Sequence, residues 1–422
     1  MLILWLFLIA FVAGGLEYIK TNRLAIFRAI IKLSNTKVRS KAKNLKHIEV
    51  NKPLASTSKQ IILDSIDKSQ HKGLNLRAMS KIEVNNIYKI FGPKPEQVLP
   101  MVKDGATKEQ VMEETGHTVG LDNVSLSIEE GEIFVCMGLS GSGKSTLIRH
   151  INRLIDPTSG EVFVNKVDVC SLDEKEILDF RKKTMSMVFQ RFGLFPHKTI
   201  IENVAYGLEI QEVPEDQRVE IAQGQINAVG LEGFEHQYPA QLSGGMQQRV
   251  GLARALATDP QILLMDEAFS ALDPLIRSDM QNQLVDLQAK LKKTIVFITH
   301  DLDESLKLGD HIGILNGGRL VQVGRPEDII LNPADDYVKA FVKDVNRPKV
   351  LRARTIMTKL NKFDKSSVNP SSTYKYDEDT YIEDFLPKVL KDRSTIEVIN
   401  KEGTTTGFIS SNELSLALTK TK

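Results

Sequence analysis

Cysteine and tryptophan are scarce in this sequence, with two cysteines and one tryptophan among 422 residues. Cys136 and Cys170 are too few to build a disulfide framework or a thiolate metal site, which fits a reducing compartment. The formal net charge is +1, so overall charge gives no reason to expect nucleic-acid binding. Hydrophobic residues make up 41% of the chain, as in ordinary globular proteins, and the length allows two or three domains.

Residues 1–78 have a composition of their own. The chain opens with MLILWLFLIAFVAGGL, which as a helix would span roughly 24 Å, short of a bilayer core of about 30 Å. Nine Lys or Arg and no acidic residue follow between Tyr18 and Ile48, which by the positive-inside rule would keep the rest of the chain cytoplasmic. The segment is either a membrane anchor with a basic linker or an upstream extension that is not translated, because MSKIEVNNIYKIFG at Met79 resembles a natural start.

Residues 93–118 interrupt what otherwise reads as two adjacent strands. Pro95 suits the first turn of a helix that Gly105 would end, although Pro100 argues against that helix. Thr107 followed by Gln110 is a capping-box pattern for a second helix, with a left-handed stop at Gly116. We therefore expect an ordered helical insertion between the two strands.

A phosphate-binding loop follows the next apolar run, in EIFVCMGLSGSGKSTLIRHINRL. Glycines in such a loop let backbone N–H groups turn toward phosphate oxygens, and the following helix points its positive end at the same place. Lys144 can reach the β- and γ-phosphates, and the Ser145 hydroxyl can ligate Mg²⁺. The predicted nucleotide-binding residues of the loop are Gly138, Ser140, Gly141, Ser142, Gly143, Lys144, Ser145 and Thr146.

Three more predicted strands end in polar residues suited to the same site. Asp266 ends the strand at 262–265 and can hold Mg²⁺ through water, while Glu267 is placed to act as general base on the attacking water. His300 ends TIVFITH, and Gln190 ends the strand in SMVFQ. Alone, the acidic pair could cap a helix and the other two could be ordinary polar residues; beside a phosphate loop, the catalytic interpretation is favoured. The predicted metal ligands are Ser145, Gln190 and Asp266.

A second glycine-rich helix start occurs in LSGGMQQRVGLARAL. Ser243, Gly244 and Gly245 would form another anion site, which is redundant within one subunit. It becomes useful if it closes over the nucleotide of a partner subunit.

These segments, in this order, resemble ABC transporter ATPases from about Lys81 to Val345. The resemblance implies an α/β P-loop NTPase fold, with a RecA-like core, an antiparallel β subdomain and a helical signature subdomain at about 195–238. It implies an ATP- and Mg²⁺-dependent homodimer, domain bounds of 79–347, and contact with a permease near Phe192–His197. The family commonly has glutamine where this chain has Met246. Further implied site residues are Phe91, which would stack on adenine, and Gln247 and Asp273, which would act across the dimer.

The insertion indicates a subgroup of this family. In the segment PMVKDGATKEQVMEETG, the chain is similar to the ATPases of quaternary-amine importers. The likeness implies uptake of glycine betaine or proline-type osmoprotectants at the cytoplasmic face of the inner membrane. The partners would be an integral membrane permease and, indirectly, an extracytoplasmic substrate-binding protein, with no nucleic acid. The alternatives are an importer of another small solute, a soluble ABC ATPase acting in translation or repair, and a nucleotide sensor.

Residues 348–422 read as helix, strand, turn, strand and helix, with TIEVIN and TGFIS as the strands. This order resembles a CBS motif, a regulatory module that normally works in pairs. One motif fits here, so either the pair forms between two subunits or the tail is degenerate. The preceding linker, NRPKVLRAR, is basic, and we expect it to release from a membrane or a partner as ionic strength rises.

Overall fold

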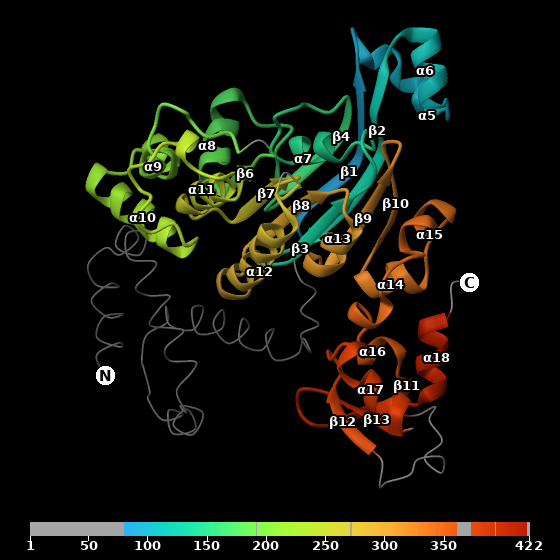
Figure 1. Cartoon of the computed structure of the whole chain (residues 1–422). Helices are drawn as coiled ribbons and strands as arrows, with labels where there is room; N and C mark the ends of the chain where they lie inside the picture. Colours follow the sequence, from blue (N-terminus) through green and yellow to red (C-terminus); the bar gives the residue numbers. More distant parts are fainter. Residues whose placement is uncertain (1–79, 191, 271, 361–372, 393, 420–422) are drawn as a thin grey trace, which may run out of the picture. The chain divides into compact units, whose positions relative to one another are not determined.

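Six strands form a central sheet in the computed structural model, which describes residues 80–419 except 191, 271, 361–372 and 393 (Figure 1). Their order is β10-β9-β3-β8-β7-β6, and neighbours pair in parallel except β10 with β9. All residues of β3, β7 and β8 are buried, which explains why these segments are continuously apolar. The bounds are β3 Ile133–Met137, β6 Met185–Val188, β7 Ile262–Asp266, β8 Thr294–Thr299, β9 His311–Asn316 and β10 Arg319–Gly324.

The two faces of this sheet belong to different hydrophobic clusters. Val135 and Met137 pack in one cluster, whereas Phe134 and Cys136 pack in the other, as the alternation of side chains along a strand requires. Burial raises the pKa of the Cys136 thiol to about 12, so this cysteine serves as a small core hydrophobe. The helices between and beyond these strands are α7 Lys144–Ile151, α8 Glu174–Thr184, α12 Pro274–Leu291, α13 Leu302–Leu308, α14 Pro326–Leu331 and α15 Asp336–Val342.

An antiparallel sheet of order β2-β1-β4-β5 lies against the core. Buried and exposed residues alternate along the second half of β2, because one face packs inward and the other meets solvent. Its bounds are β1 Ser80–Phe91, β2 Thr118–Glu129, β4 Ser159–Val164 and β5 Val167–Asp168.

The helical insertion connects β1 to β2, whose last and first residues, Phe91 and Thr118, pair directly. It contains the 3₁₀ helix η2 Pro95–Gln97 and the helices α5 Leu99–Lys103 and α6 Lys108–Thr115. The predicted capping box and the left-handed Gly116, with φ of 70°, are both present on α6. Pro100 is accommodated because α5 begins at Leu99, which puts the proline in the first turn, where its missing N–H costs nothing.

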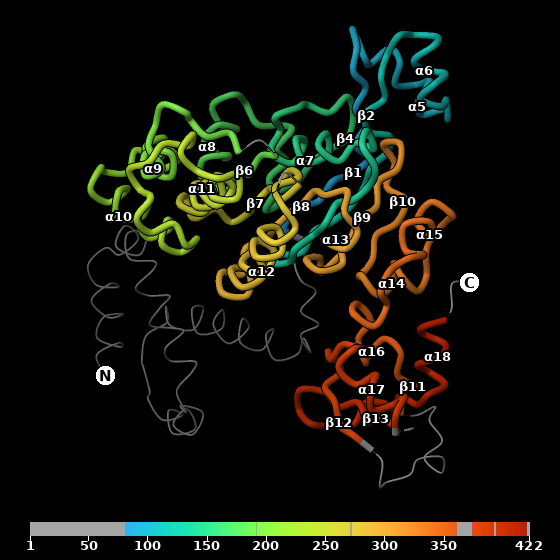
Figure 2. Tube along the Cα trace, viewed as in Figure 1, coloured from blue at the N-terminus to red at the C-terminus, as the bar shows by residue number. Residues whose placement is uncertain are grey.

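A helical unit follows β6 and precedes β7 along the chain. Figure 2 shows its path, mostly in green, before the chain returns to the sheet. It contains α9 Ile200–Ile210, α10 Glu215–Ala228, η3 Pro239–Gln241 and α11 Gly244–Ala257. The expected range of 195–238 ends too early, because α11 packs against both α9 and α10 and belongs to the same unit.

The tail has a four-stranded sheet of order β11-β14-β13-β12, in which β12 is parallel to β13. The predicted order of helix, strand, turn, strand and helix is confirmed by α17, β13, β14 and α18. Two short strands that the sequence analysis did not identify complete the sheet. The tail's elements are η4 Arg347–Lys349, α16 Ala353–Ile356, β11 Thr358–Lys359, β12 Thr373–Asp377, α17 Ile382–Asp392, β13 Thr395–Ile399, β14 Thr405–Ile409 and α18 Ser411–Thr419.

The basic linker at residues 346–354 makes contacts within the chain, and its release from a membrane or partner as salt rises stays a prediction. Arg347 is buried and donates to the carbonyl oxygen of Ala417 at 3.0 Å. Arg352 and Arg354 both pair with Glu327 of α14, so ion pairs within the chain already engage two of the linker's basic residues. Residues 1–78, which include the predicted anchor, lie outside the residues that the structure describes. No helix in the described part of the chain is both long and apolar enough to cross a bilayer.

Candidate nucleotide-binding site

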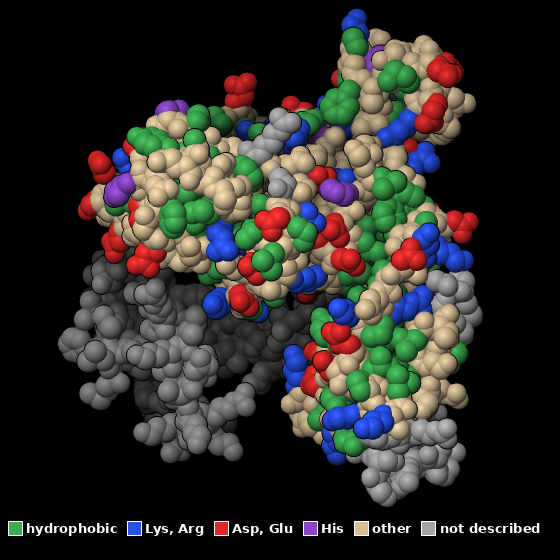
Figure 3. Space-filling model, in the orientation of Figure 1, with side chains coloured by type: hydrophobic (Ala, Val, Ile, Leu, Met, Phe, Trp, Pro, Cys, Tyr) green, Lys and Arg blue, Asp and Glu red, His purple; other side chains and the backbone are tan. Residues whose placement is uncertain are grey.

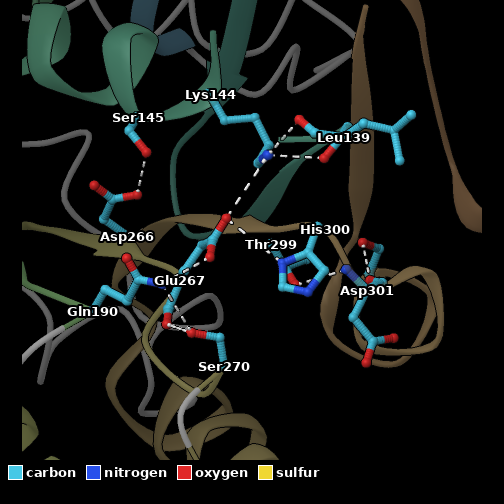
Figure 4. A network of polar contacts seen from close by, with 12 residues as sticks. Leu139, Lys144, Ser145, Gln190, Asp266, Glu267, Ser270, Thr299, His300 and Asp301 are labelled. Carbon is cyan, nitrogen blue, oxygen red and sulfur yellow. Dashed lines mark hydrogen bonds and ion pairs between the residues drawn. The ribbon is translucent and has the colours of Figure 1, made fainter. Parts of the chain in front are cut away.

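Four predicted site residues meet at one edge of the central sheet. Gln190, Glu267 and His300 follow β6, β7 and β8, which are neighbours in the sheet, and Asp266 ends β7. Because parallel strands end at the same edge, residues far apart in sequence come together there. Figure 4 shows their side chains converging below Lys144 and Ser145, which begin α7.

The loop before α7 folds around the Lys144 side chain, which is 4% exposed. The Lys144 ammonium donates to the carbonyl oxygens of Gly138, at 2.8 Å, and Leu139, at 3.0 Å. Gly138 has φ of 154°, and a Cβ there would collide with the carbonyl oxygen of Leu315, so only glycine fits. Gly141 and Gly143 also have positive φ, and Ser142 accepts a backbone hydrogen bond from Gly318.

Ser145 and Asp266 form a pair that suits Mg²⁺. The Ser145 hydroxyl donates to Asp266 Oδ1 at 2.8 Å, and Arg149 lies 3.6 Å from Oδ2 of the same carboxylate. Mg²⁺ usually takes one or two protein oxygen ligands together with phosphates and water, so this hydroxyl and carboxylate fit the ion. Sequence reasoning missed Arg149, although its position one turn after Ser145 on α7 could have indicated it.

Glu267 is the centre of a second group of contacts. Its carboxylate lies 3.8 Å from Lys144 Nζ and 3.6 Å from His300 Nδ1, and it accepts a hydrogen bond from Gln190 Nε2 at 3.1 Å. Glu267 has φ of 46°, a left-handed conformation that is uncommon for a residue with a side chain, and Ser270 donates to its carbonyl oxygen. Such strain persists where the surrounding structure fixes a functional side chain.

Gln190 does not reach the Ser145–Asp266 pair in the described contacts. Its side-chain amide donates to Glu267 and, at 3.4 Å, to Ser270. The structure therefore brings Gln190 to the predicted general base and not to the predicted metal ligands. A role as a metal ligand stays a prediction.

Phe91 lies at the end of β1 with 40% of its surface exposed. A Cβ at Gly120 of β2 would collide with the Phe91 ring, so glycine there lets the ring pack onto the neighbouring strand. Lys89 lies 5.2 Å from the ring centroid. An exposed aromatic face of this kind can stack on a base, as the resemblance implies.

Two of the residues predicted to act across the dimer, Ser243 and Asp273, are helix caps, and the helix start predicted at Ser243 is confirmed. Ser243 caps α11 and accepts a hydrogen bond from the Met246 N–H at 3.4 Å. Asp273 caps α12 in the same way, through Ile276. Gln247 donates to the carbonyl oxygen of Leu242. In the residues that the structure describes, none of these contacts joins the Glu267 group, and a role across the dimer stays a prediction.

The loop after Gln190 is held by the side chains of Arg254 and Asn203. Arg254 donates to the carbonyl oxygens of Phe192 and Gly193, at 2.8 and 2.6 Å. Asn203, which is fully buried, receives a hydrogen bond from the Phe195 N–H and donates to the Phe195 carbonyl oxygen. The predicted permease-contact segment is thus fixed to α9 and α11, which are parts of the helical unit.

Comparisons with known proteins identify the family. Residues 121–270 match the ABC transporter family. The chain is 58% identical over 279 residues to the glycine betaine/carnitine transport ATP-binding protein GbuA of Listeria monocytogenes. The aligned region covers 66% of this chain and 70% of that protein. It is 53% identical over 276 residues to the glycine betaine/proline betaine transport system ATP-binding protein ProV of Escherichia coli, covering 65% and 69%.

Two further relatives extend the comparison. The trimethylamine N-oxide transport system ATP-binding protein TmoW of Pelagibacter ubique is 42% identical over 328 residues, covering 78% of this chain and 94% of that protein. A solved ATP-binding cassette, a dimer in a post-hydrolysis state bound to ADP and Pi, is 32% identical with a TM-score of 0.50, covering 58% and 98%. The chain therefore belongs to the family of ABC transporter ATP-binding subunits, in the group of the glycine betaine transport ATP-binding proteins.

Proposed function

We propose that this chain is the ATP-hydrolysing subunit that powers uptake of glycine betaine or proline-type osmoprotectants through a partner permease. The observation that carries the enzymatic part is the convergence of Lys144, Gln190 and His300 on Glu267. The solute follows from the relatives that are more than half identical, which are named for glycine betaine transport.

Each side chain then has a separate task in hydrolysis. Lys144 leaves the loop carbonyls to hold the phosphates, and Glu267 takes the proton from the attacking water. His300 supports the γ-phosphate, and Gln190 keeps the Glu267 carboxylate oriented. Ser145 and Asp266 would hold Mg²⁺, which when bound neutralises charge on the β- and γ-phosphates.

A homodimer would complete two such sites, with Ser243, Gly245 and Asp273 of one subunit facing the nucleotide of the other. A membrane permease would dock on Phe192–His197, and a substrate-binding protein would deliver the solute from outside. The subunit would act at the cytoplasmic face of the membrane. We also propose the domain division 1–78, 79–347 and 348–422, with the tail as a single CBS-like regulatory module.

Reconstitution with a permease tests the proposed solute. Liposomes that contain the complex and internal ATP should accumulate labelled glycine betaine in preference to trimethylamine N-oxide. Trimethylamine N-oxide is the appropriate solute for comparison, because the relative that is named for its transport is matched along 94% of that relative's length. Preferential uptake of trimethylamine N-oxide would reassign the solute, and hydrolysis without uptake of either would leave only the ATPase.

A further inference from the structure

Arg277 connects two segments of the nucleotide site that are far apart in sequence. It lies near the start of α12, where a positive charge gains nothing from the helix dipole. Its guanidinium donates to the carbonyl oxygens of Leu272, at 3.1 Å, and Ser270, at 3.5 Å. On its other side it lies 3.4 Å from Asp301 Oδ2. The two carbonyls belong to the loop that leaves β7, whereas Asp301 lies just beyond β8.

The loop that leaves β7 carries the predicted general base. The Ser270 hydroxyl donates to the Glu267 carbonyl oxygen at 2.9 Å, and the Gln190 amide donates to the same hydroxyl at 3.4 Å. Glu267 has the left-handed φ of 46°, a conformation that persists only where the surroundings fix it. Arg277 is part of those surroundings, because two carbonyl oxygens of the loop accept hydrogen bonds from its Nη2 atom.

Asp301 fixes the backbone next to His300. Its N–H donates to the Thr299 hydroxyl at 3.0 Å, and its Oδ1 atom accepts the N–H of Glu304 at 3.1 Å, which caps α13. The other carboxylate oxygen, Oδ2, is the one that faces Arg277. Figure 4 shows Thr299 and Asp301 on either side of His300. Arg277 therefore joins the segment of the general base to the segment of the histidine.

The charge of Arg277 also acts on two neighbouring carboxyl groups. Glu304 is 5% exposed, and burial raises its pKa. The Asp301 charge raises the pKa of Glu304 as well, whereas the Arg277 charge lowers it. Two carboxyl groups thus lie within four residues after His300, and Arg277 offsets the repulsion between them.

Fold stability alone does not account for an arginine at this position. Two of its three contacts, at 3.4 and 3.5 Å, are longer than usual hydrogen bonds. Its buried Nε atom has no hydrogen-bond partner among the described residues. A buried donor without a partner costs free energy, so Arg277 is a poor choice for stability and a suitable one for joining two segments.

We propose that Arg277 is a positioning residue for ATP hydrolysis, which holds His300 against Glu267 by tying the loop after β7 to Asp301. This assignment rests on the role in hydrolysis that is proposed above for His300. A guanidinium presents its donors in a fixed fork, so one side chain can reach both segments at once. Displacement of a catalytic group by about 1 Å can cost about 10²-fold in rate, so Arg277 need not touch the nucleotide.

Steady-state hydrolysis by the full-length chain tests the proposal. Arg277→Met keeps the apolar part of the side chain and removes the donors. We expect kcat to fall about 10- to 100-fold, while KM for MgATP and the affinity for MgADP change less than about twofold, because the phosphate loop is untouched. Arg277→Lys should recover part of the turnover, since an ammonium can pair with Asp301 but lacks the fork that also reaches the loop.

A double-mutant cycle shows whether Arg277 acts through His300. In the background of His300→Ala, Arg277→Met should lower turnover by less than about twofold, because no histidine is left to position. Single-turnover hydrolysis with enzyme in excess measures these slow variants. Losses that multiply would overturn the proposal. If His300→Ala alone hydrolyses ATP at the unmodified rate, the proposed role of the histidine fails and this assignment fails with it.

Lys307→Met is the matched control, because Lys307 of α13 also reaches α12, through the Ser278 hydroxyl at 3.4 Å. Figure 3 shows acidic and basic side chains mixed over the face of α12 and α13, so loss of one surface cation should leave turnover within about twofold. Asp301→Asn keeps the experiment decisive should Arg277→Met fail to fold, because an asparagine oxygen can still cap α13. It should lower kcat at unchanged KM. Normal turnover in either variant, or an equal loss in Lys307→Met, would overturn the proposal.

Discussion

The carboxylate of Glu267 lies 3.6 Å from Nδ1 of His300, although the two residues belong to different strand ends. The same carboxylate lies 3.8 Å from Lys144 Nζ, so one acidic side chain contacts both the phosphate loop and the histidine. Removal of its charge alone is therefore an informative change. Glu267→Gln should retain ATP binding and lose about 10²- to 10⁴-fold in turnover, the usual contribution of a general base.

Phosphate release and nucleotide affinity, measured on the same preparation, check this expectation. The variant should also accumulate as an ATP-bound dimer in size-exclusion chromatography with light scattering. Glu220→Gln, at an exposed position on α10, is the matched control. Turnover near that of the unmodified chain would remove Glu267 from the role.

Arg254 should matter for coupling, because it fixes the loop proposed to contact the permease. Arg254→Met keeps the length of the side chain but removes both donors to Phe192 and Gly193. We expect fewer solute molecules transported per ATP hydrolysed, since hydrogen bonds from charged groups contribute about 1.5–3 kcal/mol each. The ratio is measured in liposomes. Arg249→Met is the control, because Arg249 lies on the same helix but donates to Val229, and an equal loss in both variants would refute the idea.

Gln248 is fully buried on α11, and neither of its side-chain polar atoms has a partner. It lies on the same helix face as Gly244 and Gly251, both of which approach Phe192. Gln248→Met should raise the free energy of unfolding by about 1 kcal/mol, because it removes an unpaired polar group at similar volume.

Denaturant unfolding checks this, with Gln281→Met as a contrasting variant. Gln281 is also buried, but it donates to Glu304 at 3.0 Å, so its loss should destabilise the chain. If both variants destabilise to the same extent, Gln248 has a partner such as bound water, and the expectation is wrong.

The pair of His311 and Glu132 should make stability depend on pH. The hydrogen bond from His311 Nδ1 to Glu132, at 2.6 Å, raises the pKa of the histidine in the folded chain. A raised pKa contributes stability that is fully present below the unfolded value, about 6.5, and is lost as pH rises through the folded pKa. The difference in unfolding free energy between the unmodified chain and Glu132→Gln should therefore be larger at pH 6 than at pH 9. A difference that stays constant would contradict this account.

Sequence patterns among neighbouring residues predicted several strands and helix starts. The apolar runs that became β3, β7 and β8, the capping box at Thr107 and the helix start at Ser243 needed only neighbouring residues. The meeting of Gln190, Glu267 and His300 followed from parallel strand ends together with the family resemblance. What could not be predicted depends on distant partners: the pairing of Arg352 and Arg354 with Glu327, and the contact of Gln190 with Glu267 instead of the Ser145–Asp266 pair.

The direct pairing of Phe91 with Thr118 has a practical consequence for spectroscopy. Because the two strands already meet there, the helices beyond them form an appendage that can carry a probe without a change of register. Met112 on α6 is 45% exposed, and burial raises the pKa values of both native thiols, Cys136 and Cys170. A Met112→Cys variant would therefore offer one readily reactive thiol to a fluorophore, so that a single label could be placed on the insertion.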